Sequence, residues 1–364
     1  MADLKSLNAL GQSIWYDNIR RALLESGEFE EMFKSGVTGV TSNPSIFEKA
    51  IAGSSDYDQV LDPLLAEGLP VKKVYEKLAI DDIQRTASLL RLIYADTNGK
   101  DGFVSIEVSP ELANDTEGTI VEARRLYAEV DRPNVMIKVP ATRAGIPAIE
   151  TLIGEGINVN VTLIFSLARY AEAAEAYIRG LEALDRRGGD LHRVASVASF
   201  FVSRVDAAVD RALDEKGAES LHGKIAVANA KVAYARFKEI FSGERWEALA
   251  EKGAWVQRPL WASTSTKNPA YADTLYVDSL IGPETVNTVP PATLEAFIDH
   301  GTIARTLELD VDAAEAELQQ LSELGIDLDD ITDQLLKEGV DAFAKSFRSM
   351  LASIEGKSGD EHGG

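Results

Sequence analysis

Short apolar runs rich in β-branched residues recur along the chain, and each is followed by a longer stretch with helical periodicity. This alternation is typical of parallel βα units, because a parallel strand needs a long crossover, usually a helix, before the next strand. Eight such units predict a closed (β/α)8 barrel. We expect its strands at residues 13–16, 37–41, 103–108, 135–139, 158–163, 194–198, 259–262 and 274–277.

An open, doubly wound sheet is the alternative fold for the same alternation. A dinucleotide-binding sheet of that kind carries G-x-G-x-x-G after its first strand, and this chain does not. The closed barrel is therefore the preferred interpretation. The clearest of the crossover helices is expected to begin at Ser166, whose hydroxyl suits the N-cap position.

Three further helices are expected around the barrel. One covers 74–95, within the insertion between the second and third strands, and a short one covers 291–301, with proline at its start and glycine past its end. The apolar residues of 331–354 have nearly helical spacing and predict a helix packed across the barrel. We expect one barrel domain over 1–355 and a disordered polar tail over 356–364.

The charge of the chain limits its partners. Lys and Arg total 37 against 59 Asp and Glu, which gives a net charge of -22. Such a surface repels nucleic-acid phosphates and anionic lipids, so neither nucleic acid nor membrane is an expected partner. Disulfides and thiolate metal sites are excluded because there is no cysteine. With no signal-peptide pattern and no apolar run near the roughly 18 residues that cross a bilayer, a cytoplasmic protein is expected.

Polar residues cluster where the predicted strands end, which is where barrels of this type carry their chemistry. Taken singly, each has an ordinary alternative: a carboxylate there can cap a helix or meet solvent, and Asn43-Pro44 is a common turn. A lysine, two carboxylates, amides and hydroxyls on one rim favour a functional site instead. The residues are Asp17, Asn43, Glu107, Lys138, Asn160, Thr162, Ser199 and Ser263.

Lys138 is the candidate nucleophile of this set. Its neighbours Met136, Ile137, Val139 and Pro140 place its stem among apolar side chains. The alternative is a lysine that extends its ammonium group to solvent. Burial and a nearby cation would favour the neutral amine that Schiff-base chemistry requires.

Other kinds of site find little support in the sequence. The four histidines, at 192, 222, 300 and 362, are scattered without metal-ligand spacing. The chain has no G-x-S-x-G elbow and no P-loop. We therefore expect no metal and no cofactor.

Several motifs carry a family resemblance. Thr41-Ser-Asn-Pro-Ser45, Ile137-Lys-Val-Pro-Ala-Thr142 and the run from Gly156 to Ser166 resemble transaldolases in their order and spacing. The segment Ala262-Ser-Thr-Ser-Thr-Lys-Asn-Pro269 is similar to the longer bacterial branch of that family.

The resemblance implies a mechanism for the residues that match. Lys138 attacks the ketone of a ketose phosphate and forms an imine, and Asp17 takes the proton of the C4 hydroxyl as the C3–C4 bond breaks. A three-carbon enamine stays on the lysine and adds to an aldose phosphate. Glu107 and Thr162 position water and move protons.

The resemblance also implies substrate contacts. Asn43, Asn160 and Ser199 hold hydroxyl groups of the bound fragment. The implied reaction converts sedoheptulose 7-phosphate and glyceraldehyde 3-phosphate to erythrose 4-phosphate and fructose 6-phosphate, in the non-oxidative pentose phosphate pathway. The expected partners are sugar phosphates, with the protein a monomer or homodimer.

The phosphate site rests partly on the residues themselves. Ser199 to Arg204 leads from a strand end into a predicted helix, which places N–H groups and Arg204 where an anion binds. The alternative is that Arg204 pairs with Asp206 or Asp210. Shorter transaldolases carry an arginine soon after the serine matching Ser263, and Lys267 is the candidate for that second phosphate contact here.

Two rival functions remain at this point. The first is an aldolase that protonates and releases dihydroxyacetone. Related small aldolases use a tyrosine where this chain has Phe201, and phenylalanine cannot donate a proton, which favours transfer over release. The second is a catalytically silent barrel that binds sugar phosphates, which the presence of Lys138 and Asp17 disfavours.

Overall fold

The computed structural model describes residues 2–359, and within them eight parallel strands close into a barrel in sequence order. The first strand pairs with the last, with Trp15 opposite Thr288, and this pairing closes the ring. The fold prediction is confirmed and the open sheet is excluded. The strands are β1 (Gln12–Tyr16), β2 (Val37–Val40), β3 (Val104–Glu107), β4 (Val135–Pro140), β5 (Val159–Ile164), β6 (Ser196–Phe201), β7 (Arg258–Ala262) and β8 (Thr285–Val289).

The eighth strand lies later in the chain than predicted, and the prediction for 274–277 was wrong. Leu275–Asp278 form a single helical turn, α14, and the Thr274 hydroxyl donates a hydrogen bond of 2.7 Å to the Asp278 carboxylate. A short β-branched and aromatic run does not distinguish a helical turn from a strand. The true strand lies between a turn at Pro283-Glu284 and Pro290, and all five of its residues pair with β1.

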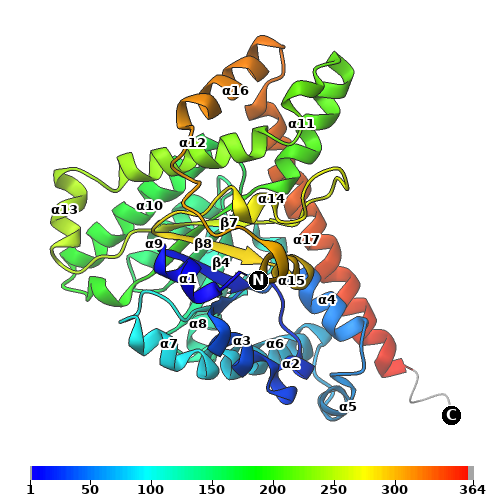
Figure 1. The fold of residues 1–364 in the computed structure, drawn as a ribbon. Coiled ribbons are helices and arrows are strands. Elements are labelled where there is room, and N and C mark those ends of the chain that lie inside the picture. Colours follow the sequence, from blue (N-terminus) through cyan, green and yellow to red (C-terminus); the bar gives the residue numbers. More distant parts are fainter. Residues whose placement is uncertain (1, 360–364) are drawn as a thin grey trace.

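Helices surround the barrel and also extend beyond it (Figure 1). They are α1 (Leu4–Ala9), α2 (Arg21–Ser26), α3 (Glu28–Ser35), α4 (Pro44–Ala52), α5 (Asp58–Ala66), α6 (Val71–Leu89), α7 (Arg91–Asp96), α8 (Thr116–Val130), α9 (Gly145–Ile153), α10 (Leu167–Arg186), α11 (Ser203–Lys216), α12 (Ile225–Ile240), α13 (Glu244–Ala250), α14, α15 (Pro291–His300), α16 (Val311–Glu323) and α17 (Leu328–Gly359). No helix in the described range is long and apolar enough to cross a membrane.

The helices expected from the sequence are present with small changes in their bounds. Ser166 caps α10, because its hydroxyl oxygen accepts from the Arg169 N–H at 3.1 Å. The short helix α15 begins at Pro291 and Gly301 follows its last residue. The helix expected over 74–95 is divided in two at Leu90, which ends α6 and precedes α7.

The last helix, α17, runs along the carboxyl-end side of the barrel and contacts α4, α6, α11 and β5 (Figure 1). Its own residues Phe343, Phe347 and Ile354 are buried, so the expected packing across the barrel is confirmed. The helix continues to Gly359, four residues into the predicted tail. Lys357 supports this extension with an ammonium contact of 2.5 Å to the Asp58 carboxylate, and the remainder of the predicted tail lies outside the described residues.

The interior of the barrel is filled and its amino-terminal end is polar. The Trp15 ring lies so close to β2 that a Cβ on Gly39 would stand 2.6 Å from ring atoms, so only glycine fits there. Asp101 accepts from Trp15 Nε1 at 2.8 Å and from the Ser13 hydroxyl, and Arg258 donates to Ser13 Oγ at 3.1 Å. These contacts satisfy polar groups that the closed barrel buries.

The insertion between β2 and β3 is tied to the barrel by a buried ion pair. Arg21 of α2 donates to Asp82 Oδ1 of α6 through Nε at 2.9 Å and Nη2 at 2.6 Å. The Tyr57 hydroxyl donates to the other oxygen of Asp82 at 2.7 Å. Burial raises the pKa of Asp82, against the opposing effect of Arg21. Arg21 and Tyr57 therefore both depend on the Asp82 carboxylate as their hydrogen-bond acceptor.

We predict that Asp82→Ala destabilises the protein far more than Asp81→Ala, although both carboxylates contact Arg21. The Asp82 side chain is 0% exposed, and its loss leaves the buried guanidinium without its only buried carboxylate partner in the described chain and the Tyr57 hydroxyl without its acceptor, at a cost of about 3–5 kcal/mol. The Asp81 side chain is 51% exposed, and its loss should cost at most about 1 kcal/mol. Urea unfolding of both variants measures the difference, and equal losses would contradict this account.

Candidate active site

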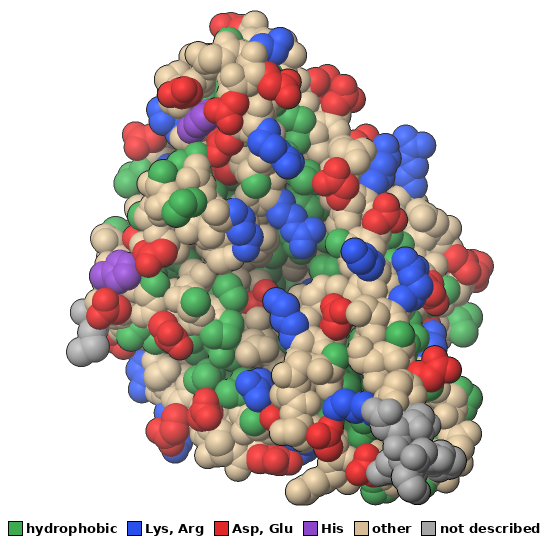
Figure 2. Space-filling model, turned by 90° about the vertical axis from the view of Figure 1, so that its right-hand side faces the viewer, with side chains coloured by type: hydrophobic (Ala, Val, Ile, Leu, Met, Phe, Trp, Pro, Cys, Tyr) green, Lys and Arg blue, Asp and Glu red, His purple; other side chains and the backbone are tan. Residues whose placement is uncertain are grey.

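A cavity of about 560 Å³ opens at the carboxyl ends of the strands. Figure 2 looks onto this face and shows Lys and Arg side chains gathered around a hollow, on a molecule whose net charge is -22. The strand ends, α4, α11 and α17 all contribute to its wall. The lining includes nine of the residues predicted from the sequence: Asp17, Asn43, Lys138, Thr162, Ser199, Phe201, Arg204, Ser263 and Lys267.

Lys138 lies on β4 with only 5% of its surface exposed. Its Nζ donates to the Ser42 carbonyl oxygen at 3.1 Å and stands 3.8 Å from Glu107 Oε2. Because the parallel register sets Glu107 of β3 opposite Lys138, the two side chains are neighbours by construction of the sheet. The solvent-extended alternative is excluded. The nearest charged group described at Nζ is the Glu107 carboxylate, which favours the protonated amine where a cation would favour the neutral one.

Glu107 is a carboxyl group poised to exchange a proton. Burial raises its pKa to about 7, although Lys138 acts in the opposite direction. Among the described residues, its Oε2 is buried without a hydrogen-bond partner, and so is Oγ1 of Thr162, which lines the cavity. Glu107 itself does not line the cavity and stands behind Lys138. Two unsatisfied buried oxygens near one lysine are what a site that handles water and protons needs.

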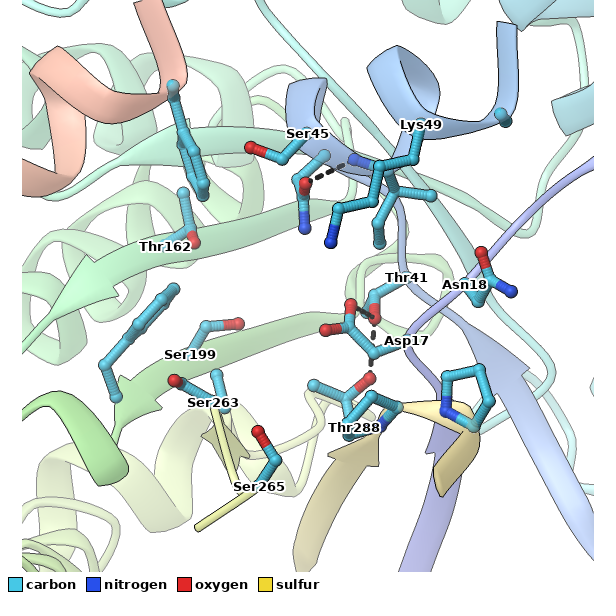
Figure 3. Close-up of a pocket in the computed structure, with 18 of the residues that line it drawn as sticks. Asp17, Asn18, Thr41, Ser45, Lys49, Thr162, Ser199, Ser263, Ser265 and Thr288 are labelled. Carbon is cyan, nitrogen blue, oxygen red and sulfur yellow. Dashed lines mark hydrogen bonds between the residues drawn. The ribbon is translucent and has the colours of Figure 1, made fainter. Parts of the chain in front are cut away.

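Asp17 is held by a chain of hydroxyl groups (Figure 3). Thr41 Oγ1 donates to Asp17 Oδ1 at 2.7 Å and lies 2.6 Å from Thr288 Oγ1. Since Thr41 donates its one hydroxyl hydrogen to the carboxylate, Thr288 must donate to Thr41. Burial raises the pKa of Asp17, and the charge of Lys138 and the Thr41 hydrogen bond oppose that rise. Thr288 was missed in the sequence because the eighth strand was placed too early.

The two predicted asparagines have different positions. Asn43 caps α4 by accepting from the Ile46 N–H at 3.0 Å, so its NH2 group is free to face the cavity that it lines. Asn160 is fully buried and outside the lining. It donates to Ser105 Oγ at 3.1 Å and accepts from the Ser199 hydroxyl at 2.7 Å. Asn160 therefore orients Ser199, which does reach the cavity.

Arg204 lies in the first turn of α11, with Cζ 5.4 Å from the centre of the Phe201 ring. It forms no ion pair within residues 2–359. The alternative pairing with Asp206 or Asp210 is wrong, because these carboxylates accept hydrogen bonds from Tyr276 and Tyr271 instead. Burial lowers the pKa of Arg204, and Glu338 of α17 acts against this.

Two lysines complete a cationic wall with Arg204. Lys267 Nζ lies 2.7 Å from Ser265 Oγ. Burial lowers the pKa of Lys267, and the charges of Arg204 and Lys49 lower it further. Lys49 projects from α4 above the strand ends (Figure 3). Lys49 was not predicted from the sequence. The one feature that could have indicated it is its spacing of four residues from Ser45, which places both side chains on the same face of α4. Three like charges at one wall fit an anion.

Metal coordination has no counterpart in the described chain. Among residues 2–359, no group of three or more His, Asp and Glu side chains is arranged to hold a metal ion. The predicted residues that meet at the cavity instead combine an amine, carboxyl groups with raised pKa values, hydroxyls and cations. This set can form and break bonds at a carbonyl group by proton transfer while holding an anionic tail.

Comparison of the sequence with known proteins points to one family. Residues 14–354 match the family model described as Transaldolase/Fructose-6-phosphate aldolase. A transaldolase 2 from Nostoc punctiforme is 48% identical over 97% of this chain and 97% of its own length. A transaldolase from Neisseria meningitidis is 48% identical over 97% of this chain and 100% of its own. A transaldolase 1 from Streptomyces avermitilis is also 48% identical, over 98% of this chain and 97% of its own.

The raised pKa of Glu107 predicts a specific pH dependence of stability. Between its ordinary value of 4.5 and about 7, the folded protein holds a proton that the unfolded chain has released. The free energy of unfolding therefore falls as pH rises through this window. Glu107→Gln removes this contribution, so from pH 5 to pH 8 the variant should lose about 2–3 kcal/mol less than the parent.

Urea unfolding at the two pH values measures this difference. Glu215→Gln, at an exposed position on α11, is the control and should follow the parent. If Glu107→Gln keeps the parent's pH dependence, the buried carboxyl does not titrate in this range.

Proposed function

This chain belongs to the transaldolase/fructose-6-phosphate aldolase family, and from that premise we propose that it moves a dihydroxyacetone unit between sugar phosphates on Lys138. The observation that carries the proposal is a buried lysine amine beside a proton-accepting carboxyl group, at the base of a cavity with a cationic wall. Each part has a role in the proposed reaction, and none requires a cofactor.

The first step joins the amine to the ketone carbon of the donor. Glu107, 3.8 Å from Nζ and with a pKa of about 7, can take the proton that Lys138 must lose before it attacks. Glu107 then gives this proton to the hydroxyl group of the carbinolamine, which loses water and leaves an iminium ion. The unpaired Thr162 hydroxyl is available to hold that water.

The second step breaks the C3–C4 bond. Asp17 takes the proton of the C4 hydroxyl, an aldehyde forms at C4 and leaves as an aldose phosphate, and the bonding electrons pass into the iminium to give an enamine. A raised pKa makes Asp17 a stronger base than an exposed carboxylate. The hydroxyl chain from Thr288 through Thr41 keeps it oriented.

The third step is the reverse addition to a different aldehyde. Asn43 and Ser199 hold hydroxyls of the three-carbon fragment, with Asn160 supporting Ser199. Arg204 and Lys267 hold the phosphate of the arriving acceptor. Phe201 lies on the cavity wall and offers no proton to the enamine, so the fragment stays bound until the acceptor arrives.

The specific reaction in this proposal is sedoheptulose 7-phosphate plus glyceraldehyde 3-phosphate to erythrose 4-phosphate plus fructose 6-phosphate. That reaction belongs to the non-oxidative pentose phosphate pathway in the cytoplasm. A monomer or a homodimer can perform it, because every group used above comes from one chain.

We predict that borohydride with fructose 6-phosphate adds a reduced three-carbon fragment to Lys138, found by mass spectrometry of the digested protein. Lys138→Arg keeps the charge without the nucleophilic amine and should take no label. Asp17→Asn still forms the imine but cannot open the C3–C4 bond, so it should carry the whole six-carbon phosphate. A label on another residue would refute the mechanism.

Product analysis separates transfer from simple cleavage. With fructose 6-phosphate and erythrose 4-phosphate, transfer product should form at least about tenfold faster than free dihydroxyacetone, because Phe201 cannot protonate the enamine. Chromatography of the reaction mixture measures both rates. Free dihydroxyacetone at the rate of transfer would instead make the protein an aldolase.

A further inference from the structure

We propose that Tyr271 and Asp210 are positioning residues that hold Lys267 at the cavity and so determine how strongly the site binds a substrate phosphate. The inference rests on the proposed function. It concerns the loop 263–274, which joins β7 to α14 and brings Ser263, Ser265 and Lys267 to the cavity wall.

The loop is fastened to α11 at its beginning. The Ser203 N–H donates to the Ser263 carbonyl oxygen at 3.0 Å, and the hydroxyls of the two serines lie 2.9 Å apart. Arg204, the next residue of α11, is the other cation that faces the same cavity. The start of the loop and Arg204 therefore share one support.

A second attachment follows Lys267 in the chain. The Tyr271 hydroxyl donates to Asp210 Oδ2 at 2.6 Å, and Asp210 Oδ1 accepts from the Gly223 N–H at 3.1 Å. Both carboxylate oxygens are thus occupied. Asp210 lies on α11, two turns beyond Arg204, so the helix that carries one phosphate cation also fixes the loop that carries the other.

The backbone at Gly223 lies close against the Tyr271 ring. A Cβ on Gly223 would stand 2.8 Å from Tyr271 Cζ, and Gly223 has a φ of +67°, so glycine meets both requirements. Further along, the Tyr276 hydroxyl donates to Asp206 Oδ2 at 2.8 Å. Beyond Lys267, the loop is therefore held against α11 by the two tyrosine hydrogen bonds and packs against Gly223.

Charge explains why Lys267 needs this support. Its charged neighbours at the cavity are Arg204 and Lys49, which repel it, and it forms no ion pair with a carboxylate within residues 2–359. Lys267 is exposed, with only part of its side chain shielded at the cavity, so packing does little to hold it. Without the Tyr271–Asp210 bond, the repulsion is relieved by movement of the loop away from the cavity when no phosphate is bound. Binding then has to reverse that movement.

The test is Tyr271→Phe, which removes the hydroxyl and keeps the ring. We expect KM for glyceraldehyde 3-phosphate to rise about three- to tenfold, the effect of one lost hydrogen bond, with kcat within about twofold of the parent. KM for unphosphorylated glyceraldehyde should stay unchanged, because Lys138 and Asp17 lie on other elements. A uniform rise of both KM values, or a fall in kcat alone, would overturn the proposal.

Two matched variants sharpen this comparison. Tyr177→Phe removes a hydroxyl that donates to the Trp255 carbonyl oxygen at 2.7 Å, before the amino end of β7 and so at the other end of that strand from the loop, and should leave both KM values unchanged. Lys267→Ala shows how far KM for glyceraldehyde 3-phosphate rises when the lysine contact is lost completely. Adding Tyr271→Phe to it should raise that KM no further, since Tyr271 acts through Lys267. If the two substitutions multiply their effects on KM in the double variant, Tyr271 does not act through Lys267.

Two further measurements keep the outcome decisive. Should Tyr271→Phe not fold, Asp210→Asn keeps an acceptor for the tyrosine and is expected to raise the same KM by a smaller factor; an unchanged KM would count against the proposal. Should the parent show neither a borohydride label nor transfer, the proposed function fails by itself. Calorimetry with inorganic phosphate then decides the positioning role, and equal affinities of parent and Tyr271→Phe would overturn it.

Discussion

The pairing of β1 with β8 is the contact on which the active site depends. It closes the sheet and places Thr288 beside Thr41, so that the hydroxyl chain to Asp17 exists only in the closed ring. Glu107 stands opposite Lys138 through the register of the neighbouring strands β3 and β4. A ring of parallel strands delivers every strand end to one rim, and distant segments of the chain meet there without any specific recognition between them.

The sequence was informative wherever a functional residue stands at the end of an apolar strand. Lys138, Glu107 and Asp17 were found in that way, because the carboxyl ends of parallel strands converge on one rim of a barrel. Lys49 was not, since it lies on a helix whose reach over the cavity depends on tertiary packing. The eighth strand was misplaced because a β-branched run and a helical turn look alike over four residues. Whether Arg204 was paired depended on tyrosines far along the chain, Tyr271 and Tyr276.

Electrostatics divides the molecule into regions with different roles. Carboxylates dominate the total charge, yet three cations meet at the cavity wall and are left without ion pairs in the described chain. Elsewhere, a buried cation such as Arg21 has carboxylate partners at hydrogen-bond distance. Arg204 is partly buried without an ion pair in the described residues, and the charges of Lys49 and Lys267 add to its own, so an anionic ligand at this wall would supply the missing counter-charge. Stability and binding thus depend on different sets of charged groups.

The last helix makes the barrel and the cavity depend on different parts of the chain. All eight strands precede α17, but Phe343 of α17 belongs to the cavity wall, and a Cβ on Gly339 would stand 3.6 Å from the Arg204 guanidinium. The strands pair with one another in a closed ring to which α17 adds no strand. A loosened α17 would therefore leave the ring intact and open one side of the cavity.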